Sequence, residues 1–115
     1  MRVVALTILA AFFLGALFQS DAVEYDWPFG RVLSACDTGD QASCDFLYGV
    51  MDDEFGDAYD LAECNDQFYA DAGDGNFTPR VRSNLMGWLR AHPEAHTLDV
   101  GDATNAALRG FYQCR

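Results

Sequence analysis

The chain has 115 residues, half of them hydrophobic, and its 18 acidic and seven basic residues give a formal net charge of −11. All the basic residues are arginines. A surface this acidic repels nucleic acid and anionic membranes, which excludes both as partners, whereas a basic protein suits it.

The N-terminal residues have the layout of a secretory signal peptide. Arg2 is followed by an apolar run over residues 3–18 and by small residues at Ser20 and Ala22. The run is shorter than the ~20 residues of a membrane span, which argues against an anchor. We therefore predict a signal peptide over residues 1–22 and one small domain over residues 23–115 that is periplasmic or secreted.

Two amphipathic helices are predicted next. In the first, Pro28 suits the first helical position, and an apolar face repeats at intervals of three and four: Phe29, Val32, Leu33 and Cys36. The second repeats in the same way, with Asp40 as its cap and Gly56 as its stop, through Ser43, Phe46, Leu47, Val50, Met51 and Phe55.

A long connection precedes the third helix. Because a structureless loop of about twenty residues is unusual in a small domain, we expect a short helix around residues 59–63 and then a true loop over residues 65–77. The third helix begins at Thr78, which can cap it, and Pro79 fits its first turn. Its apolar face consists of Val81, Leu85, Trp88 and Leu89.

The stretch "AHPEAH" contains both histidines of the chain. On one helix, His92 and His96 would share a face and could bind zinc. Pro93 lacks an amide hydrogen and disfavours helical geometry at the residue before it, so the third helix should end near His92. We interpret His92, Pro93 and Glu94 as a structural turn and predict no metal site and no other cofactor.

The last helix is predicted within residues 97–114, where Gly101 weakens the first turn. Its apolar residues are Val100, Ala103, Ala107, Leu108 and Phe111. The expected fold is therefore all-α, a small bundle of four to five helices.

The four cysteines, Cys36, Cys44, Cys64 and Cys114, predict two disulfides in an exported chain. A zinc site would need closer spacing. Three pairings are possible, and sequence does not choose among them. The position of Cys36 and Cys44 on either side of a helical bend slightly favours joining those two, and Cys64 to Cys114.

The acidic residues are concentrated, since no basic residue lies between Arg31 and Arg80. The run supports solubility, or else forms a docking face for a basic protein. No glycine-rich phosphate loop and no G-x-S-x-G elbow occurs in the sequence, and disulfide-bonded cysteines are not nucleophiles. We expect a binding protein and not an enzyme.

The order of these features resembles the Rap/Tai immunity proteins of type VI secretion systems. The resemblance rests on a first helix carrying Cys36, on "CDFLYGVMD" from Cys44, on Cys64, on "WLRAHPE" from Trp88, and on an alanine-rich last helix ending at Cys114. It covers nearly all of residues 23–115.

The resemblance implies a homodimer of helical protomers that blocks the cleft of a peptidoglycan amidase toxin with a protruding loop. Its expected contact is the loop over residues 65–77, with the candidate partner-binding residues Phe68, Tyr69, Asp71, Asp74, Asn76 and Phe77. The alternative is that Phe68, Tyr69 and Phe77 only hold the loop against the core. An alternative hypothesis for the whole chain is a general acidic periplasmic binding or stress module.

Overall fold

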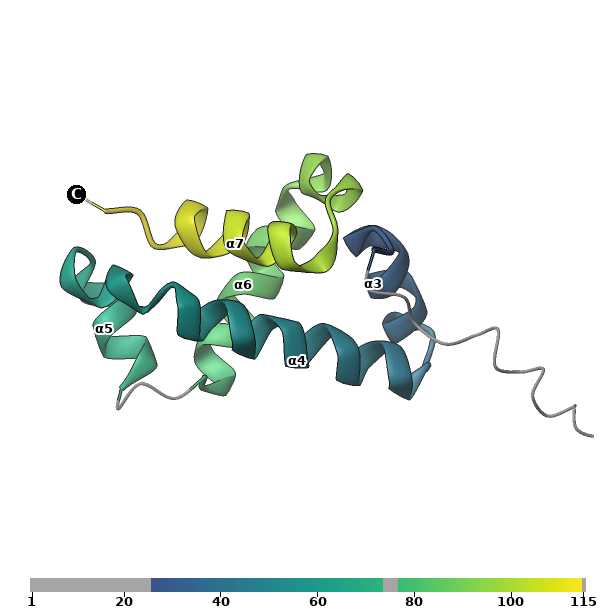
Figure 1. The fold of residues 1–115 in the computed structure, drawn as a ribbon, viewed down its shortest axis with the longest axis horizontal. Coiled ribbons are helices and arrows are strands. Elements are labelled where there is room, and N and C mark those ends of the chain that lie inside the picture. Colours follow the sequence, from purple (N-terminus) through teal and green to yellow (C-terminus); the bar gives the residue numbers. More distant parts are fainter. Residues whose placement is uncertain (1–25, 74–76, 115) are drawn as a thin grey trace, which may run out of the picture.

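The computed structural model describes residues 26–73 and 77–114, so the predicted signal peptide over residues 1–22 lies outside the described residues. The described parts form five α-helices and two 3₁₀ helices (Figure 1): α3 (Phe29–Asp37), α4 (Gln41–Asp57), η2 (Tyr59–Glu63), α5 (Asp66–Ala72), α6 (Pro79–Ala91), η3 (Pro93–Thr97) and α7 (Val100–Phe111). The all-α bundle with two disulfides is confirmed.

The long helix α4 forms the base of the bundle. α7 lies along α4 and runs in the same direction, while α6 crosses behind both (Figure 1). α3 packs on the beginning of α4, and α5 lies at the opposite end, beside the C-terminal segment. None of the helices within the described ranges is long and apolar enough to span a bilayer.

The first two helices form where the apolar periodicity predicts them, but their ends differ from the prediction. Pro28 is the N-cap of α3 and not its first helical residue. α4 continues through Gly56 to Asp57, because Phe55 and Ala58 are both buried and extend its apolar face past the glycine. The Asp40 carboxylate accepts a bond from the Ser43 hydroxyl at 2.7 Å and caps no backbone N–H group.

The predicted loop over residues 65–77 is wrong, because most of it is the helix α5. The Asn65 side chain accepts a hydrogen bond from the Phe68 N–H at 2.8 Å and so caps the helix. Phe68 and Ala72, four positions apart, are fully buried, and Gly73 ends the helix with φ of +59°. The short helix expected around residues 59–63 is confirmed as η2.

In the second half of the chain, Thr78 caps α6 as expected, since its hydroxyl oxygen accepts a bond from the Val81 N–H at 3.2 Å. α7 forms despite Gly101, because the Asp99 carboxylate accepts from the Asp102 N–H at 2.8 Å. Phe111 was assigned to the core wrongly: it is 42% exposed, whereas Tyr112 is fully buried. The helix ends at Phe111, and the non-helical backbone at Tyr112 directs the Tyr112 ring into the core.

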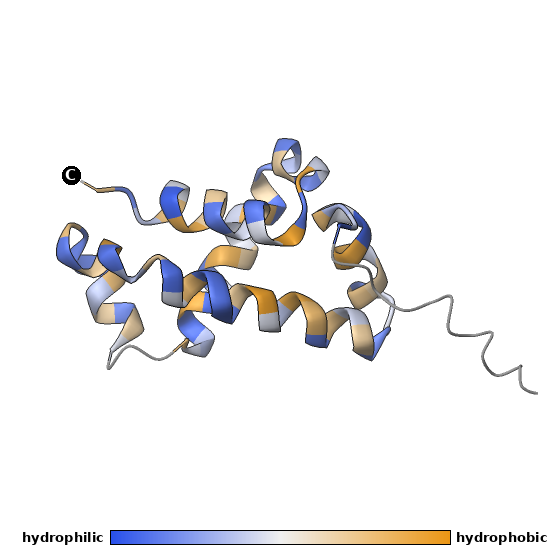
Figure 2. Ribbon diagram, viewed as in Figure 1, coloured by the Kyte–Doolittle hydropathy of each residue, from blue (hydrophilic) through white to orange (hydrophobic). Residues whose placement is uncertain are grey.

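One core runs through the bundle. Figure 2 shows hydrophobic residues along the inner faces of the helices and hydrophilic residues concentrated toward the end of α4. The largest fully buried side chains include Tyr112, Phe29, Phe55, Phe68, Leu47, Met51, Leu61, Leu85, Leu89 and Leu108. Where α6 meets α7, the Trp88 indole lies directly on Gly110, so that any side chain at Gly110 would collide with the ring.

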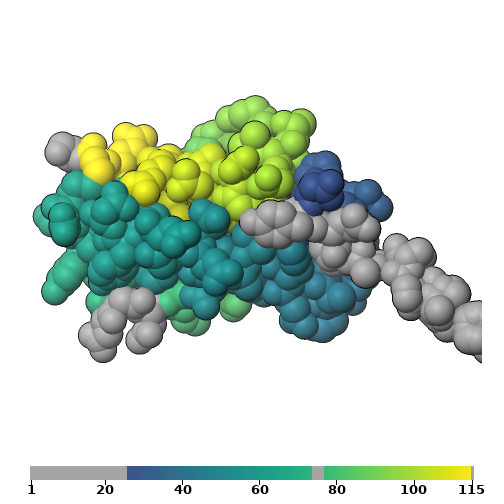
Figure 3. Space-filling view, viewed as in Figure 1, coloured from purple at the N-terminus to yellow at the C-terminus, as the bar shows by residue number. Residues whose placement is uncertain are grey.

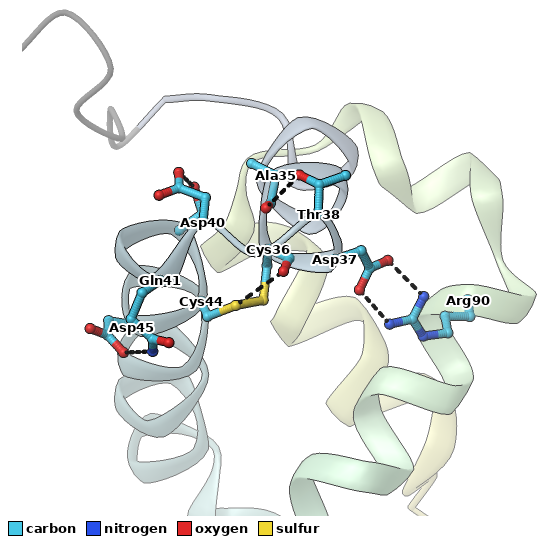
Figure 4. The surroundings of a disulfide bond; sticks show 10 residues. Ala35, Cys36, Asp37, Thr38, Asp40, Gln41, Cys44, Asp45 and Arg90 are labelled. Atoms are coloured by element: carbon cyan, nitrogen blue, oxygen red, sulfur yellow. Dashed lines mark hydrogen bonds and ion pairs between the residues drawn. A yellow bond between two sulfur atoms is a disulfide. The ribbon is translucent and has the colours of Figure 1, made fainter. Parts of the chain in front are cut away.

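The disulfides pair Cys36 with Cys44 and Cys64 with Cys114, which is the pairing that the helical bend favoured. Figure 4 shows the first bond joining the end of α3 to the beginning of α4. Beside it, the Arg90 guanidinium donates to both carboxylate oxygens of Asp37, at 3.1 and 3.2 Å, and lowers the pKa of Asp37. Two disulfides indicate an oxidising environment.

Candidate interaction surface

The structure places the predicted partner-binding residues in different environments. Phe68 is fully buried, Asp71 is 7% exposed, and Phe77 is half-buried with its ring 5.6 Å from that of Phe55. Tyr69 is 63% exposed. Asp74 and Asn76 lie outside the described residues. Among the described members of the set, Tyr69 alone offers a largely exposed side chain to a partner.

The Asp71 carboxylate instead joins α5 to α6 and to the C-terminal segment. Tyr112 and Asn84 both donate to its Oδ2 at 2.9 Å, and Gln67 donates to its Oδ1 at 2.7 Å. Arg80 Nε lies 3.9 Å from Oδ1. Burial is the main cause that raises the pKa of Tyr112 well above its usual value, so the hydroxyl stays protonated and donates.

The C-terminal segment, residues 112–114, holds α5 by consecutive contacts. Cys114 is bonded to Cys64, and Gln113 O accepts a bond from Asn65 Nδ2 at 2.6 Å. The ring of Tyr112 meets that of Phe68 edge-on, with centroids 5.0 Å apart. In Figure 3 the yellow end of the chain lies against the teal surface of η2 and α5. α5 is therefore positioned by residues far from it in the sequence.

A pocket of about 430 Å³ opens between η2 and α5. Its walls come from one continuous segment, Glu63, Cys64, Asn65, Asp66 and Gln67. The Glu63 and Asp66 side chains are exposed, and the Asn65 side chain is fixed at both of its polar atoms. The pocket is thus an acidic hollow whose base is held by a disulfide.

Most of the acidic run between α3 and α5 faces solvent. Its exposed members are Asp37, Asp40, Asp45, Asp52, Asp53, Asp57, Asp60, Glu63 and Asp66. Arg90 pairs with Asp37, and Arg109 pairs with Asp60 at 3.0 Å and lowers the pKa of Asp60. In the part of the chain that the structure describes, the other exposed carboxylates of this run have no ion-pair partner.

Glu54 is the half-buried member of the acidic run. Its pKa is raised, first by burial and then by the charges of Asp57, Asp102, Asp53 and Asp99. Carboxylates from α4 and from the beginning of α7 therefore repel one another across this contact at neutral pH.

The two histidines follow α6, which ends at Ala91: His92 is its C-cap, and His96 lies in η3. Because Pro93 has no N–H to donate, the last carbonyls of α6 need other donors. His92 Nδ1 lies 2.7 Å from Trp88 O, and His96 Nε2 lies 2.8 Å from Leu89 O; since a carbonyl only accepts, both ring nitrogens donate. Within residues 26–73 and 77–114, no group of three or more His, Cys, Asp or Glu residues could hold a metal ion.

Sequence reasoning missed Tyr112, Asn84 and Arg80 as partners of Asp71. The bonds of Asp71 to Asn84 and Tyr112 join residues 13 and 41 positions apart, so no local pattern connects them. The cap at Asn65 did have a local signal, an asparagine followed by an aspartate and, after one short helix, by Gly73.

Comparisons of this chain with protein-family models, with curated protein sequences and with solved structures find no match. Its function is therefore inferred from its own residues and from the order of its motifs.

Proposed function

We propose that the protein is a periplasmic immunity or inhibitor protein that binds and blocks a peptidoglycan amidase toxin of a type VI secretion system. It acts by covering the toxin's cleft and performs no catalysis. The observation that carries the proposal is the exposed acidic run from α3 to α5, most of whose carboxylates have no ion-pair partner among residues 26–73 and 77–114.

Such a surface favours a basic protein partner. Unpaired carboxylates over one part of a surface speed the encounter with a cationic protein and disfavour acidic competitors. The order of cysteines and of the "WLRAHPE" segment, which resembles Rap/Tai proteins, supports an amidase as that partner. The same resemblance supports a homodimer.

The direct test uses the oxidised protein and the amidase encoded by the gene adjacent to its own. We expect equimolar protein to abolish peptidoglycan hydrolysis, with a dissociation constant in the nanomolar range, typical of a tight inhibitor of standard interface size. The association rate should fall as salt rises from 50 to 500 mM, since steering by exposed charge is screened.

A hydrolase of unrelated specificity is the control and should keep its activity. An absence of binding at micromolar concentration, with both disulfides intact, would contradict the proposal. Size-exclusion chromatography with light scattering tests the dimer separately, and a monomeric mass would remove only that part.

The alternative is a general acidic periplasmic binding or stress module without a dedicated toxin. The net charge of −11 favours it. This hypothesis predicts that the protein protects many unfolded basic client proteins from aggregation. It also predicts that this protection is lost when exposed carboxylates such as Asp45 and Asp52 are changed to amides. Protection that survives those changes, or that is confined to one toxin, argues against it.

A further inference from the structure

The disulfide between Cys64 and Cys114 is the more accessible of the two to an external thiol. Cys114 is exposed and Cys64 is half-buried, whereas both cysteines of the first bond are half-buried. Cys64 also lines the pocket between η2 and α5, so this residue borders solvent on that side. Because thiol–disulfide exchange depends on access to the sulfur that is attacked, the bond between Cys64 and Cys114 should exchange first.

The neighbouring charges make Cys114 the sulfur that is attacked. The attacking species is a thiolate, which nearby carboxylates repel. Cys64 directly follows the exposed carboxylate of Glu63, whereas Cys114 follows the neutral side chain of Gln113. At the first bond, each of the two cysteines is followed directly by an aspartate (Figure 4). A thiolate therefore meets the least repulsion at Cys114.

The bond between Cys64 and Cys114 fastens a segment that makes other contacts to α5. Next to Cys114, Gln113 O accepts a bond from Asn65 Nδ2 at 2.6 Å, and Asn65 is also the N-cap of α5. The ring of Tyr112 meets that of Phe68 edge-on. With the disulfide open, only hydrogen bonds and ring contacts would tie the C-terminal segment to α5. A helix of seven residues depends on such tertiary contacts.

The first disulfide closes a turn that the backbone also closes. Gly39 N donates to Cys36 O, and Asp40 N donates to Ala35 O, both at 3.0 Å. Neither hydrogen bond involves sulfur. Opening the bond between Cys36 and Cys44 would therefore leave the turn between α3 and α4 hydrogen-bonded.

We propose that the Cys64–Cys114 disulfide is a thiol-exchange site and a redox latch for α5. The reacting molecule is a dithiol, such as the C-x-x-C pair of an oxidoreductase. Opening the latch loosens α5 from the core and makes its buried face, which carries Phe68 and Ala72, accessible. The rest of the bundle stays folded with the first disulfide closed. The proposal does not depend on the toxin partner.

The exchange proceeds in two steps that balance. A thiolate of the dithiol attacks Cys114 Sγ, the bond between the two sulfur atoms breaks, and Cys64 Sγ leaves with the electron pair and takes up a proton. The second thiolate of the dithiol then displaces Cys114 Sγ, which is protonated in turn. The protein disulfide is reduced by two electrons to two thiols, and the dithiol is oxidised to a disulfide.

The order of reduction can be measured on the oxidised protein with dithiothreitol as the dithiol, by quenching with iodoacetamide and mapping the digest by mass. Alkylation of Cys64 and Cys114 should be about tenfold faster than that of Cys36 and Cys44. In concentrated urea both bonds are accessible, so their rates should agree to within about twofold. Equal rates in the folded protein, or a tenfold difference that persists in urea, would overturn the proposal.

Two variants with a single disulfide exclude reshuffling between the bonds as the cause of the order. Cys36→Ser/Cys44→Ser keeps the bond between Cys64 and Cys114, which should be reduced at its wild-type rate. Cys64→Ser/Cys114→Ser keeps the first bond, which should be reduced about tenfold more slowly. Equal rates in the two variants would contradict the difference in accessibility.

The latch itself is tested on wild-type protein in which dithiothreitol has opened the bond between Cys64 and Cys114 alone. Amide shifts should be concentrated in residues 65–72 and 112–114, and hydrogen-exchange protection of α5 should fall about tenfold more than that of α3 and α4. Oxidised glutathione should restore the original spectrum. Unfolding of the whole bundle would make the bond purely structural, and an unchanged α5 would show that nothing is released; either result would overturn the latch.

Discussion

The two ends of the bundle are stapled in opposite ways. At one end, Cys36 and Cys44 lie eight residues apart and close a turn between consecutive helices. At the other, Cys64 and Cys114 lie 50 residues apart and join α5 to the end of the chain. The backbone turn beside the first disulfide is local, since Asp40 N donates to Ala35 O, although Arg90 also bonds to Asp37 there. At the other end, Asn65 donates to Gln113 O.

The difference is that the first disulfide and its turn join neighbouring residues of one segment, whereas α5 is held by the end of the chain. α5 has seven residues, too few for a helix that is stable by itself. It is held by Tyr112, Gln113 and Cys114, which the packing of α7 places beside it. The pocket and Tyr69 are built on this non-local end.

The largest expected effect comes from breaking the long-range staple. In the loop-entropy account, removing a bond that closes a 50-residue separation costs about 4 kcal/mol. The double variant Cys64→Ala/Cys114→Ala should lose about that much in urea unfolding. Hydrogen exchange should show α5 losing protection before α4 does, and equal loss over both helices would contradict the division.

Breaking the local staple should cost less. By the same loop-entropy account, the disulfide that closes the eight-residue separation between Cys36 and Cys44 contributes about 2.5 kcal/mol to stability. The double variant Cys36→Ala/Cys44→Ala should keep α5 protected in hydrogen exchange. Loss of α5 protection in that variant would show that the two ends are coupled.

The contact between Tyr112 and Asp71 at the α5 end can be tested by removing a single atom, the Tyr112 hydroxyl oxygen. Tyr112→Phe removes a donor to buried Asp71 and should cost about 1 to 2 kcal/mol, as for a hydrogen bond to a charged group. Tyr69→Phe removes the same atom from an exposed ring and should change the stability by less than about 0.5 kcal/mol. Equal effects would mean that Asp71 finds another donor.

At the local end, Gly39 offers the matching change in the α3–α4 turn. Its φ of +102° is unfavourable for a residue with a Cβ, so Gly39→Ala should cost about 1 kcal/mol in urea unfolding. Gly49 lies within α4 with nothing near its missing Cβ, so Gly49→Ala should stabilise the protein by about 0.5 to 1 kcal/mol. Changes of the same sign would refute the conformational argument.

The smallest effect is expected at Glu54, midway between the two ends. Its raised pKa means that the folded state binds a proton more readily than the unfolded state. The cost of keeping Glu54 charged in the folded protein is fully present at neutral pH, above the folded-state pKa of Glu54. It fades as the pH falls through that pKa. Glu54→Gln should therefore stabilise the protein by about 0.5 kcal/mol at pH 7, and the gain should fade as the pH falls through the raised pKa of Glu54 and be absent below the ordinary glutamate pKa of 4.5.

The sequence by itself determined the helices other than α5 and favoured the disulfide between Cys36 and Cys44, because both depend on short-range rules. Thr78 before Pro79 begins α6, Pro93 ends it, and the apolar spacing of Phe29, Val32 and Leu33 fixes the buried face of α3. A bend between two predicted helices was enough to favour joining Cys36 to Cys44.

Only the tertiary structure decided which residues of the 65–77 segment are available to a partner. Tertiary contacts turned an expected loop into α5, buried Phe68 and Asp71, and left Tyr69 outside. They also put Tyr112 into the core in place of Phe111. The physical reason is that burial at this end is set by contacts up to 50 residues apart, whose free energy no local pattern encodes.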